Sequence, residues 1–460
     1  MITSAKMVAA VQKSHKTVSF DPFAAAAAER VAGISGPGLL LIRDSRSGGG
    51  DLSNKVLQAM TTSLLGKGLD KMNKTMVLGM MPLMDALIAN APDPIDLHGW
   101  CREIITIAST EAIWGSKNPF KSEKIARDFW YVLQSSSNSP LLIRSYRYFE
   151  THLSILLANV LPSITARKAY FARESVVQAM LEYANSGGFE EQDCSDLALS
   201  QWQTQKSLGA TDINIARIET AFNLGVLSNT VPSAFWSIFD ICSRPELLNA
   251  VREELEQNAI VVDPETNVHC IDLGRMRSVC PIFVSSFQET LRVHSTSAPT
   301  RMVYEDVMLD NTYLLKAGSV VQISGPGVNS ETAVWGQDAK EYDITHFLSE
   351  RRDGAKGSFK PKPRPTSFMS FGASPNLCPG RHFAAAEVLS LVAMLLLRAD
   401  VKPSKGQWWT PRLNAWAVAA TVSPPAEAYP VSVHAREKYK GVKWSFVVEG
   451  EKDRFDLVVG

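Results

Sequence analysis

The sequence has little of what marks several large classes of protein. Its 460 residues hold only six cysteines, too few for the disulfide scaffold of a small secreted protein. Lys and Arg number 47 and Asp and Glu also number 47, so a net charge of zero gives no global attraction to nucleic acid. Hydrophobic residues at 45% exclude the disordered class. We therefore expect a globular, intracellular enzyme with a large core.

Long apolar runs are also absent. Lysines interrupt residues 1–20, so this segment is neither a secretory signal nor a membrane anchor. The apolar stretch 76–91 contains Pro82 and Asp85, and the stretch 383–397 is too short to span a bilayer. Buried core helices are the better interpretation of both stretches.

The spacing of apolar residues predicts a mainly α fold with a small β-sheet region. Helical spacing dominates from residue 53 to 256, whereas residues 302–323 alternate and contain turn residues, as a small antiparallel sheet does. The sequence shows no repeats and no flexible linker. We therefore expect one domain over residues 1–460, with a helical part (1–210), a second part (211–435) and a tail (436–460) of unknown role.

One cysteine lies in a sequence context that is typical of a reactive or metal-binding thiol. Cys378 lies in the loop SFMSFGASPNLCPGRHF, directly before a Pro-Gly pair that opens a helix. A helix N-terminus stabilises a thiolate and is expected to lower its pKa, so Cys378 is a candidate nucleophile or metal ligand. Zinc and iron–sulfur sites need several ligands and no C-x-x-C pair is present, but an axial haem ligand needs one cysteine only. The plain alternative is a buried, inert cysteine.

The residues around this cysteine resemble the haem-binding signature of the cytochrome P450 family, Phe-x-x-Gly-x-Arg-x-Cys-x-Gly. Phe371 and Gly380 match it, whereas Ser374 replaces the second Gly and Asn376 stands where a basic residue usually contacts a haem propionate. The resemblance implies a shortened cytochrome P450 fold with haem b as cofactor and this cysteine as the axial thiolate. The residues that it places at the haem are Phe371, Asn376, Cys378, Arg381 and Arg301.

Further motifs of the family follow in the expected order. Glu289 and Arg292 form a Glu-x-x-Arg pair on one helix face, upstream of a meander that begins near Trp335. His346 takes the place of the third member of the family's Glu-Arg-Arg triad, usually Arg. Arg301, in APTRMV, matches a basic residue that usually holds a propionate. The resemblance implies that Glu289, Arg292 and His346 support the thiolate loop.

The expected oxygen-side helix departs from the usual acid–alcohol pair. That place reads Ser228, Asn229 and Thr230, which the resemblance makes the candidate catalytic residues. Pro232 lacks an N–H group, so a kink or local opening of the helix is expected there. The stretch 228–236 is similar to the branch containing sterol 7-alpha- and 12-alpha-hydroxylases and prostacyclin synthase. In the plain alternative, Asn229 only bends the helix.

The resemblance implies a haem-thiolate monooxygenase acting on a lipophilic small molecule such as a sterol, a terpenoid or another secondary metabolite. Besides O2 it would need NADPH-cytochrome P450 reductase, because the sequence shows no nicotinamide or flavin fingerprint. The basic residues Lys360, Lys362, Arg364 and Arg381 would meet an acidic partner, or simply form a solvated loop. We expect a monomer that binds no nucleic acid.

Two alternative functions stay open. A haem-thiolate isomerase or dehydratase would rearrange a peroxide without reductase, and a non-catalytic remnant would bind no haem. The start of the chain is similar to a segment that follows a membrane anchor and the first strands in this family. The family is expected at the endoplasmic reticulum membrane, so without an anchor we expect a cytoplasmic or peripheral membrane protein.

Overall fold

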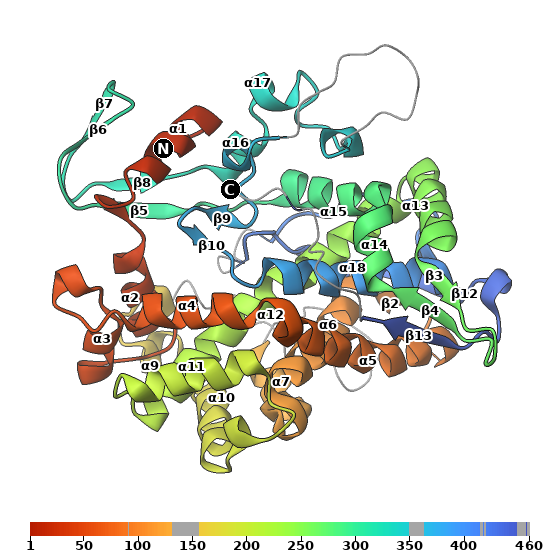
Figure 1. Ribbon diagram of the computed structural model, residues 1–460, viewed down its shortest axis with the longest axis horizontal. Helices are drawn as coiled ribbons and strands as arrows, with labels where there is room; N and C mark the ends of the chain where they lie inside the picture. Colours follow the sequence, from red (N-terminus) through yellow and green to blue (C-terminus); the bar gives the residue numbers. More distant parts are fainter. Residues whose placement is uncertain are drawn as a thin grey trace.

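The protein is mainly α-helical with small sheets, which confirms the fold class predicted from the sequence (Figure 1). The computed structural model describes residues 1–90, 92–130, 156–348, 363–414, 417, 420–448 and 457. The helices are α1 (Ala5–Lys13), α2 (Asp21–Arg30), α3 (Gly36–Ile42), α4 (Leu52–Ser63), α5 (Gly66–Asn90), α6 (Leu97–Trp114), α7 (Glu123–Phe129), α9 (Pro162–Thr165), α10 (Arg167–Asn185), α11 (Asp196–Ser207), α12 (Asp212–Cys242), α13 (Pro245–Asn258), α14 (Leu273–Val279), α15 (Pro281–His294), α16 (Gly325–Asn329), α17 (Thr332–Trp335) and α18 (Arg381–Arg398). Short 3-10 turns are η1 (Ser45–Ser47), η2 (Gly115–Lys117), η3 (Pro119–Lys121), η4 (Gly188–Glu190), η5 (Ile344–His346), η6 (Pro365–Ser367) and η7 (Glu437–Tyr439).

The strands are short and form several separate sheets. Their bounds are β1 (Val18–Ser19), β2 (Ile95–Asp96), β3 (Ile260–Val262), β4 (His269–Asp272), β5 (Thr300–Val303), β6 (Val307–Leu309), β7 (Tyr313–Leu315), β8 (Val320–Gln322), β9 (Gly372–Ala373), β10 (Asn376–Leu377), β11 (Ala399–Pro403), β12 (Pro430–Ala435) and β13 (Trp444–Val447). The strand orders are β1-β5-β8, β11-β12-β2 and β13-β4-β3, with hairpins β6-β7 and β9-β10. The predicted strands of 302–323 correspond to β5–β8.

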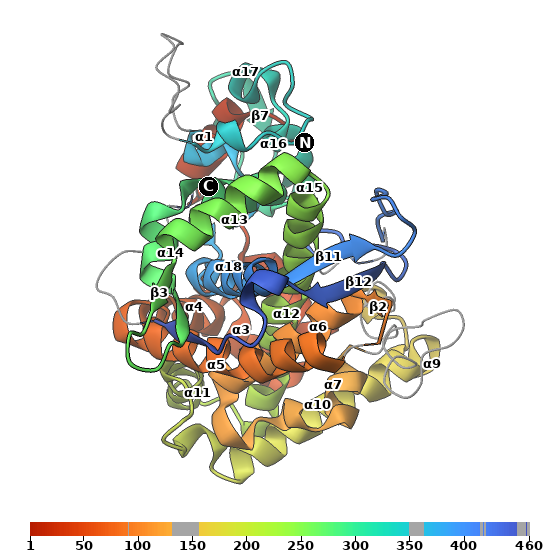
Figure 2. The same cartoon turned by 90° about the vertical axis from the view of Figure 1, so that its right-hand side faces the viewer.

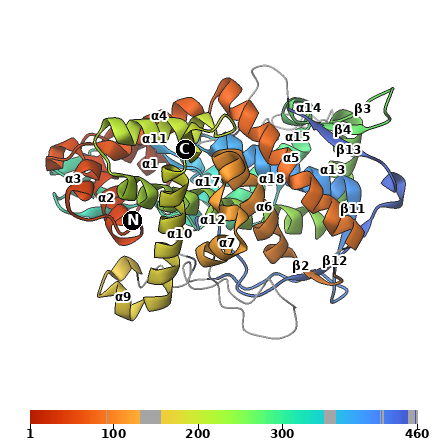
Figure 3. The same cartoon turned by 90° about the horizontal axis from the view of Figure 1, so that it is seen from below.

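Helices α12 and α18 form the middle layer of the molecule. In Figures 1 and 2, α7, α10 and α11 lie on one side of them, and α1 and α15–α17 lie on the other. Seen from below, α10 crosses α12 (Figure 3). All residues from Thr230 to Cys242 of α12 are buried, because the helix packs against α6, α10, α15 and α18. Apolar residues therefore occur all round this part of the helix instead of on one face.

The central helix runs unbroken through its proline. Pro232 lies inside α12, and the expected local opening does not interrupt the helix. Hydroxyl groups supply extra bonds around this point, since Ser233 Oγ donates to the carbonyl of Asn229 at 2.7 Å and Thr230 Oγ1 donates to that of Val226 at 2.8 Å. These bonds stabilise a stretch in which proline removes one backbone donor.

The largest of three buried apolar clusters in the described residues joins distant parts of the chain. It includes residues from Val31 to Val448 and is centred on α5, α6, α12 and α18. The tail takes part in it through β13, which pairs in parallel with β4 and buries Trp444. The last part of the tail, residues 449–456 and 458–460, lies outside the described residues. Nowhere in the described part is a helix both long and apolar enough to span a bilayer.

Candidate active site

The loop that carries Cys378 is a small hairpin that directly precedes α18. Strands β9 and β10 pair antiparallel, with Asn376 opposite Ala373, and Gly372 has a φ of +87° that favours glycine. The N–H of Cys378 donates to the carbonyl of Phe371 at 2.9 Å. Arg381, the first residue of α18, donates to the carbonyl of Cys378 at 2.9 Å. The hairpin and the helix thus fix the cysteine from both sides.

The electrostatics of the cysteine differ from the sequence prediction. Burial raises the pKa of the Cys378 thiol, while the N–H of Gly380 and the charge of Arg381 act in the opposite direction. The predicted lowering of this pKa is therefore wrong for the chain alone, because desolvation of the thiolate outweighs both favourable groups. A bound metal ion removes the thiol proton outright.

Both Cys378 and one face of α12 keep accessible surface, although they belong to the interior of the protein. Cys378 packs against the main core yet keeps some accessible surface. On α12, which packs against α18, the residues Phe222, Gly225, Val226 and Asn229 form an accessible stripe. A Cβ added at Gly225 would meet no heavy atom within 4 Å. The site therefore has free volume along α12.

A buried cation lies directly behind the cysteine hairpin. Arg301, on β5, is 4% exposed and donates to the carbonyl of Ala373 at 3.0 Å and to that of Thr300 at 2.9 Å. Burial lowers its pKa, and Asp21 partly opposes this effect. No carboxylate of the described residues lies within ion-pair distance of it. A buried guanidinium without an acid partner fits a carboxylate ligand such as a haem propionate.

The structure brings the three triad residues into direct contact. Arg292 donates to both carboxylate oxygens of Glu289, at 2.6 and 2.8 Å, and both side chains are buried. His346 lies on η5, with Nδ1 at 3.1 Å from Glu289 Oε1 and Nε2 at 2.9 Å from the carbonyl of Trp335. Both neighbours of the ring are acceptors, so both bonds form only when both ring nitrogens carry a proton.

Asn329, which no sequence motif marks, connects the triad to the cysteine loop. Its carbonyl accepts from Arg292 at 2.7 Å, and its side chain donates to the carbonyl of Arg292 at 3.1 Å. Its Oδ1 accepts from the N–H of Met369 at 3.1 Å. Ser370, the next residue, donates to the carbonyl of Leu291 on α15 at 3.0 Å. No spacing rule marks an asparagine 37 residues beyond Arg292.

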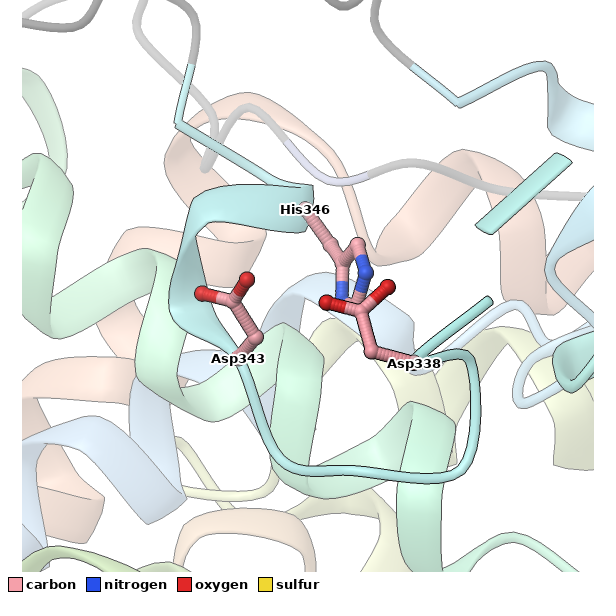
Figure 4. Close-up of side chains that lie close together, drawn as sticks. All are labelled: Asp338, Asp343 and His346. Atoms are coloured by element: carbon pink, nitrogen blue, oxygen red, sulfur yellow. The ribbon is translucent and has the colours of Figure 1, made fainter. Parts of the chain in front are cut away.

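The ring of His346 also lies near two aspartates, as Figure 4 shows. Possible ligand atoms of Asp338, Asp343 and His346 lie within 4.8 Å of one another. However, both nitrogens of His346 already have partners, and the carboxylate of Asp343 accepts from the N–H and the hydroxyl of Thr345. We therefore interpret this cluster as part of the triad's surroundings and not as a metal centre.

The three candidate residues of the oxygen side differ in exposure. Ser228 and Thr230 are buried, and the hydroxyl of Thr230 bonds within the helix. Only Asn229 lies on the accessible stripe of α12, where it contacts Thr421, a residue that no sequence motif singled out. Among the basic residues expected to meet a partner, Arg364 and Arg381 are described, whereas Lys360 and Lys362 lie outside the described residues.

The site offers one sulfur, one unpaired buried cation and free volume between helices, which fits a haem group. A model of the family described as Cytochrome P450 matches residues 51–428. The chain belongs to the cytochrome P450 family. Its cofactor is therefore haem with a cysteine-ligated iron, and the enzyme is an oxidoreductase of the monooxygenase type. The residues that would hold the group are Cys378, through its thiolate, and Arg301, through its guanidinium.

Individual relatives of this cytochrome P450 come from fungi and mammals. Cytochrome P450 monooxygenase nodJ of Hypoxylon pulicicidum is 39% identical over 100% of the chain and 85% of its own length. A cytochrome P450 monooxygenase of Gibberella zeae is 23% identical over 94% of the chain and 80% of its own length. Rat 25-hydroxycholesterol 7-alpha-hydroxylase is 23% identical over 85% of the chain and 90% of its own length. The last of these belongs to the sterol 7-alpha-hydroxylases that the sequence resembles around Asn229.

Proposed function

We propose that this cytochrome P450 hydroxylates a lipophilic small molecule such as a sterol, a terpenoid or another secondary metabolite. In the balanced reaction, the substrate R–H, O2, two electrons and two protons give R–OH and water. Haem with a thiolate ligand supplies the oxygen chemistry when it is bound. The chain supplies Cys378 as the ligand, Arg301 as the propionate partner and the triad as support for the loop.

An apolar cavity is the observation that carries the substrate class. It has a volume of about 270 Å³ and lies between α2, α3, α4 and α12. Ser53 is its only polar lining residue, and alanine, valine, isoleucine and leucine side chains form the rest. Ile218, Ala221 and Leu224 line it from α12, about one to three turns before Asn229. Such a lining favours a hydrocarbon group over a charged one.

The proposal includes an external electron donor. Electrons from NADPH would arrive through cytochrome P450 reductase, since the sequence contains no nicotinamide or flavin fingerprint. We further propose that residues 1–460 act as one catalytic domain, as a monomer at the periphery of a membrane. The shared core from Val31 to Val448 supports the single domain.

The first test concerns the ligand. The reduced, carbon monoxide-bound protein should show the red-shifted Soret band of a thiolate-ligated haem, and Cys378→Ser should lose it because serine supplies no thiolate. Cys270→Ser, at a partly exposed cysteine in β4, is the matched control and should keep the band. An unchanged band in Cys378→Ser would contradict the assignment.

The same wild-type preparation then tests the reaction. With NADPH, reductase and a panel of sterols and terpenoids, mass spectrometry should detect a product heavier than its substrate by one oxygen atom. Omitting the reductase should abolish it. A product of unchanged mass, formed from a hydroperoxide without NADPH, would instead establish the isomerase alternative.

A further inference from the structure

A short segment near the C-terminus is tied to α12 through one threonine. Thr421 donates its backbone N–H to Oδ1 of Asn229 at 2.7 Å and its hydroxyl to the same atom at 3.0 Å. Its carbonyl accepts from the N–H of Thr296 at 2.6 Å. Thr421 therefore connects the central helix to the segment that follows α15.

The neighbours of Thr421 hold it in place from two sides. Val422 pairs with Ser295 in an antiparallel bridge, next to the bond between Thr296 and Thr421. From α12, the indole N–H of Trp236 donates to the carbonyl of Ser423 at 2.9 Å. The position of Thr421 relative to Asn229 is thus set by bonds that do not involve Asn229 itself.

The chemistry of these bonds fixes which way the amide of Asn229 points. A backbone N–H can only donate, so the atom that faces it must be the amide oxygen and not the nitrogen. Two donors from Thr421 occupy both lone pairs of this oxygen. The amide nitrogen gives one proton to the carbonyl of Gly225 at 3.4 Å, and no other residue of the described chain accepts its second proton.

The second proton lies beside free volume. Asn229 and Gly225 belong to the accessible stripe of α12, and Gly225 is exposed although most of the helix is buried. Thr296 is exposed as well, between the buried residues Ser295 and Ser297. These accessible residues are adjacent, because Thr421 bonds to both Asn229 and Thr296.

We propose that Thr421 is a positioning residue that turns the carboxamide of Asn229 so that an N–H donor faces the free volume along α12, here called the hollow, on the side where the haem would bind. The inference rests on the proposed function, because the N–H of Asn229 can act on a ligand only if haem binds beside it. A carboxamide releases no proton near neutral pH. Asn229 would therefore hold a small ligand in the hollow by a fixed hydrogen bond, where an acid–alcohol pair would transfer a proton.

Infrared spectroscopy of the reduced, carbon monoxide-bound holoenzyme tests the donor. A hydrogen bond to the oxygen of carbon monoxide lowers its stretching frequency, so Asn229→Ala should raise that frequency. Thr421→Val has the shape of threonine and keeps the backbone N–H but loses the hydroxyl, so one donor instead of two holds the amide oxygen. Its spectrum should keep the wild-type band and gain a minor band near the Asn229→Ala frequency. Thr421→Ser is the matched control and should retain the wild-type band.

Two infrared results would overturn the proposal. An unchanged frequency in Asn229→Ala would show that no N–H faces the hollow. A single wild-type band in Thr421→Val, alongside a shifted band in Asn229→Ala, would show that the threonine hydroxyl does not orient the amide.

Amide hydrogen exchange on the same proteins tests the hydrogen bonds between Thr421 and Asn229 without relying on haem. The N–H of Thr421 should exchange about tenfold faster in Asn229→Ala, because its acceptor is gone. An unchanged exchange rate would show that the N–H of Thr421 is not bonded to Asn229, and would overturn the proposal. A wild-type protein without the thiolate Soret band would overturn the proposed function, and the exchange result would still decide the role of Thr421.

Discussion

His346 makes two buried contacts at the place of the third triad residue. Its ring spans the distance between the Glu289 carboxylate and the carbonyl of Trp335, at 3.1 and 2.9 Å, where the family usually has an arginine. Arg292 occupies both oxygens of the same carboxylate. A histidine therefore reaches the same two acceptors, the Glu289 carboxylate and the carbonyl of Trp335, at this position.

Removing this donor is expected to destabilise the triad. His346→Ala should lower the free energy of unfolding by about 3 kcal/mol, because it leaves a buried carboxylate with fewer partners. The midpoint of denaturant unfolding measures the loss, and faster haem dissociation should accompany it. His346→Arg is the control that supplies N–H donors at the same position, and it should recover most of the stability. Equal loss in both variants would argue against the donor role.

At the scale of elements, α18 carries a buried acid in the layer that supports the cysteine. Burial raises the pKa of Glu387 to about 8, and the bond from Ser109 on α6 partly opposes the shift. The second oxygen of Glu387 has no protein partner in the described structure. The neutral acid is thus the form that suits the contact between α6 and α18.

This acid predicts a pH dependence of stability. In the unfolded chain the pKa of Glu is about 4.3, so the folded state binds the proton more tightly and stability falls as pH rises from about 4 to 8. Glu387→Gln cannot lose a proton. Between pH 5 and 8.5, the wild type should lose about 4 kcal/mol more unfolding free energy than Glu387→Gln. Parallel pH profiles in denaturant titrations would contradict this.

At the scale of the whole molecule, the C-terminal strands join parts that lie far apart in sequence. Strand β12 pairs with β2, and the N–H of Tyr429 donates to Asp96 at 2.9 Å. Strand β13 pairs with β4, where the ring of Trp444 lies 5.4 Å from that of His269 and 5.1 Å from that of Tyr439. The tail thus completes a sheet that borders α5 and α14.

Loss of this tail contact should weaken the fold without removing the thiolate. Trp444→Ala is expected to lower the free energy of unfolding by about 3 kcal/mol, through lost burial and a residual cavity. The carbon monoxide spectrum of the intact fraction should stay unchanged. Tyr313→Ala, at a ring that is 58% exposed, is the control and should cost little. An unchanged unfolding midpoint in Trp444→Ala would show that the tail does not support the core.

Short-range patterns were sufficient for several features. The thiolate loop, the Glu289–Arg292 pair and the long central helix follow from local spacing, because they depend on residues within a few turns of one another. The lowered pKa expected for Cys378 did not follow, since desolvation comes from residues packed around the loop. The expected opening at Pro232 failed for a similar reason, because buried packing and nearby hydroxyls hold the helix continuous.

The sequence by itself predicted the family, through the motifs that it shares with it, and the mainly α fold, through the spacing of its apolar residues. It also singled out Cys378 as the cysteine that we propose as the haem ligand. Only the tertiary structure decided which residues support them. Asn329 joins the triad to the cysteine loop, Thr421 orients Asn229, and β13 closes a sheet onto β4. These contacts link residues more than 35 positions apart. No sequence period encodes such a separation, and folding alone brings these donors and acceptors together.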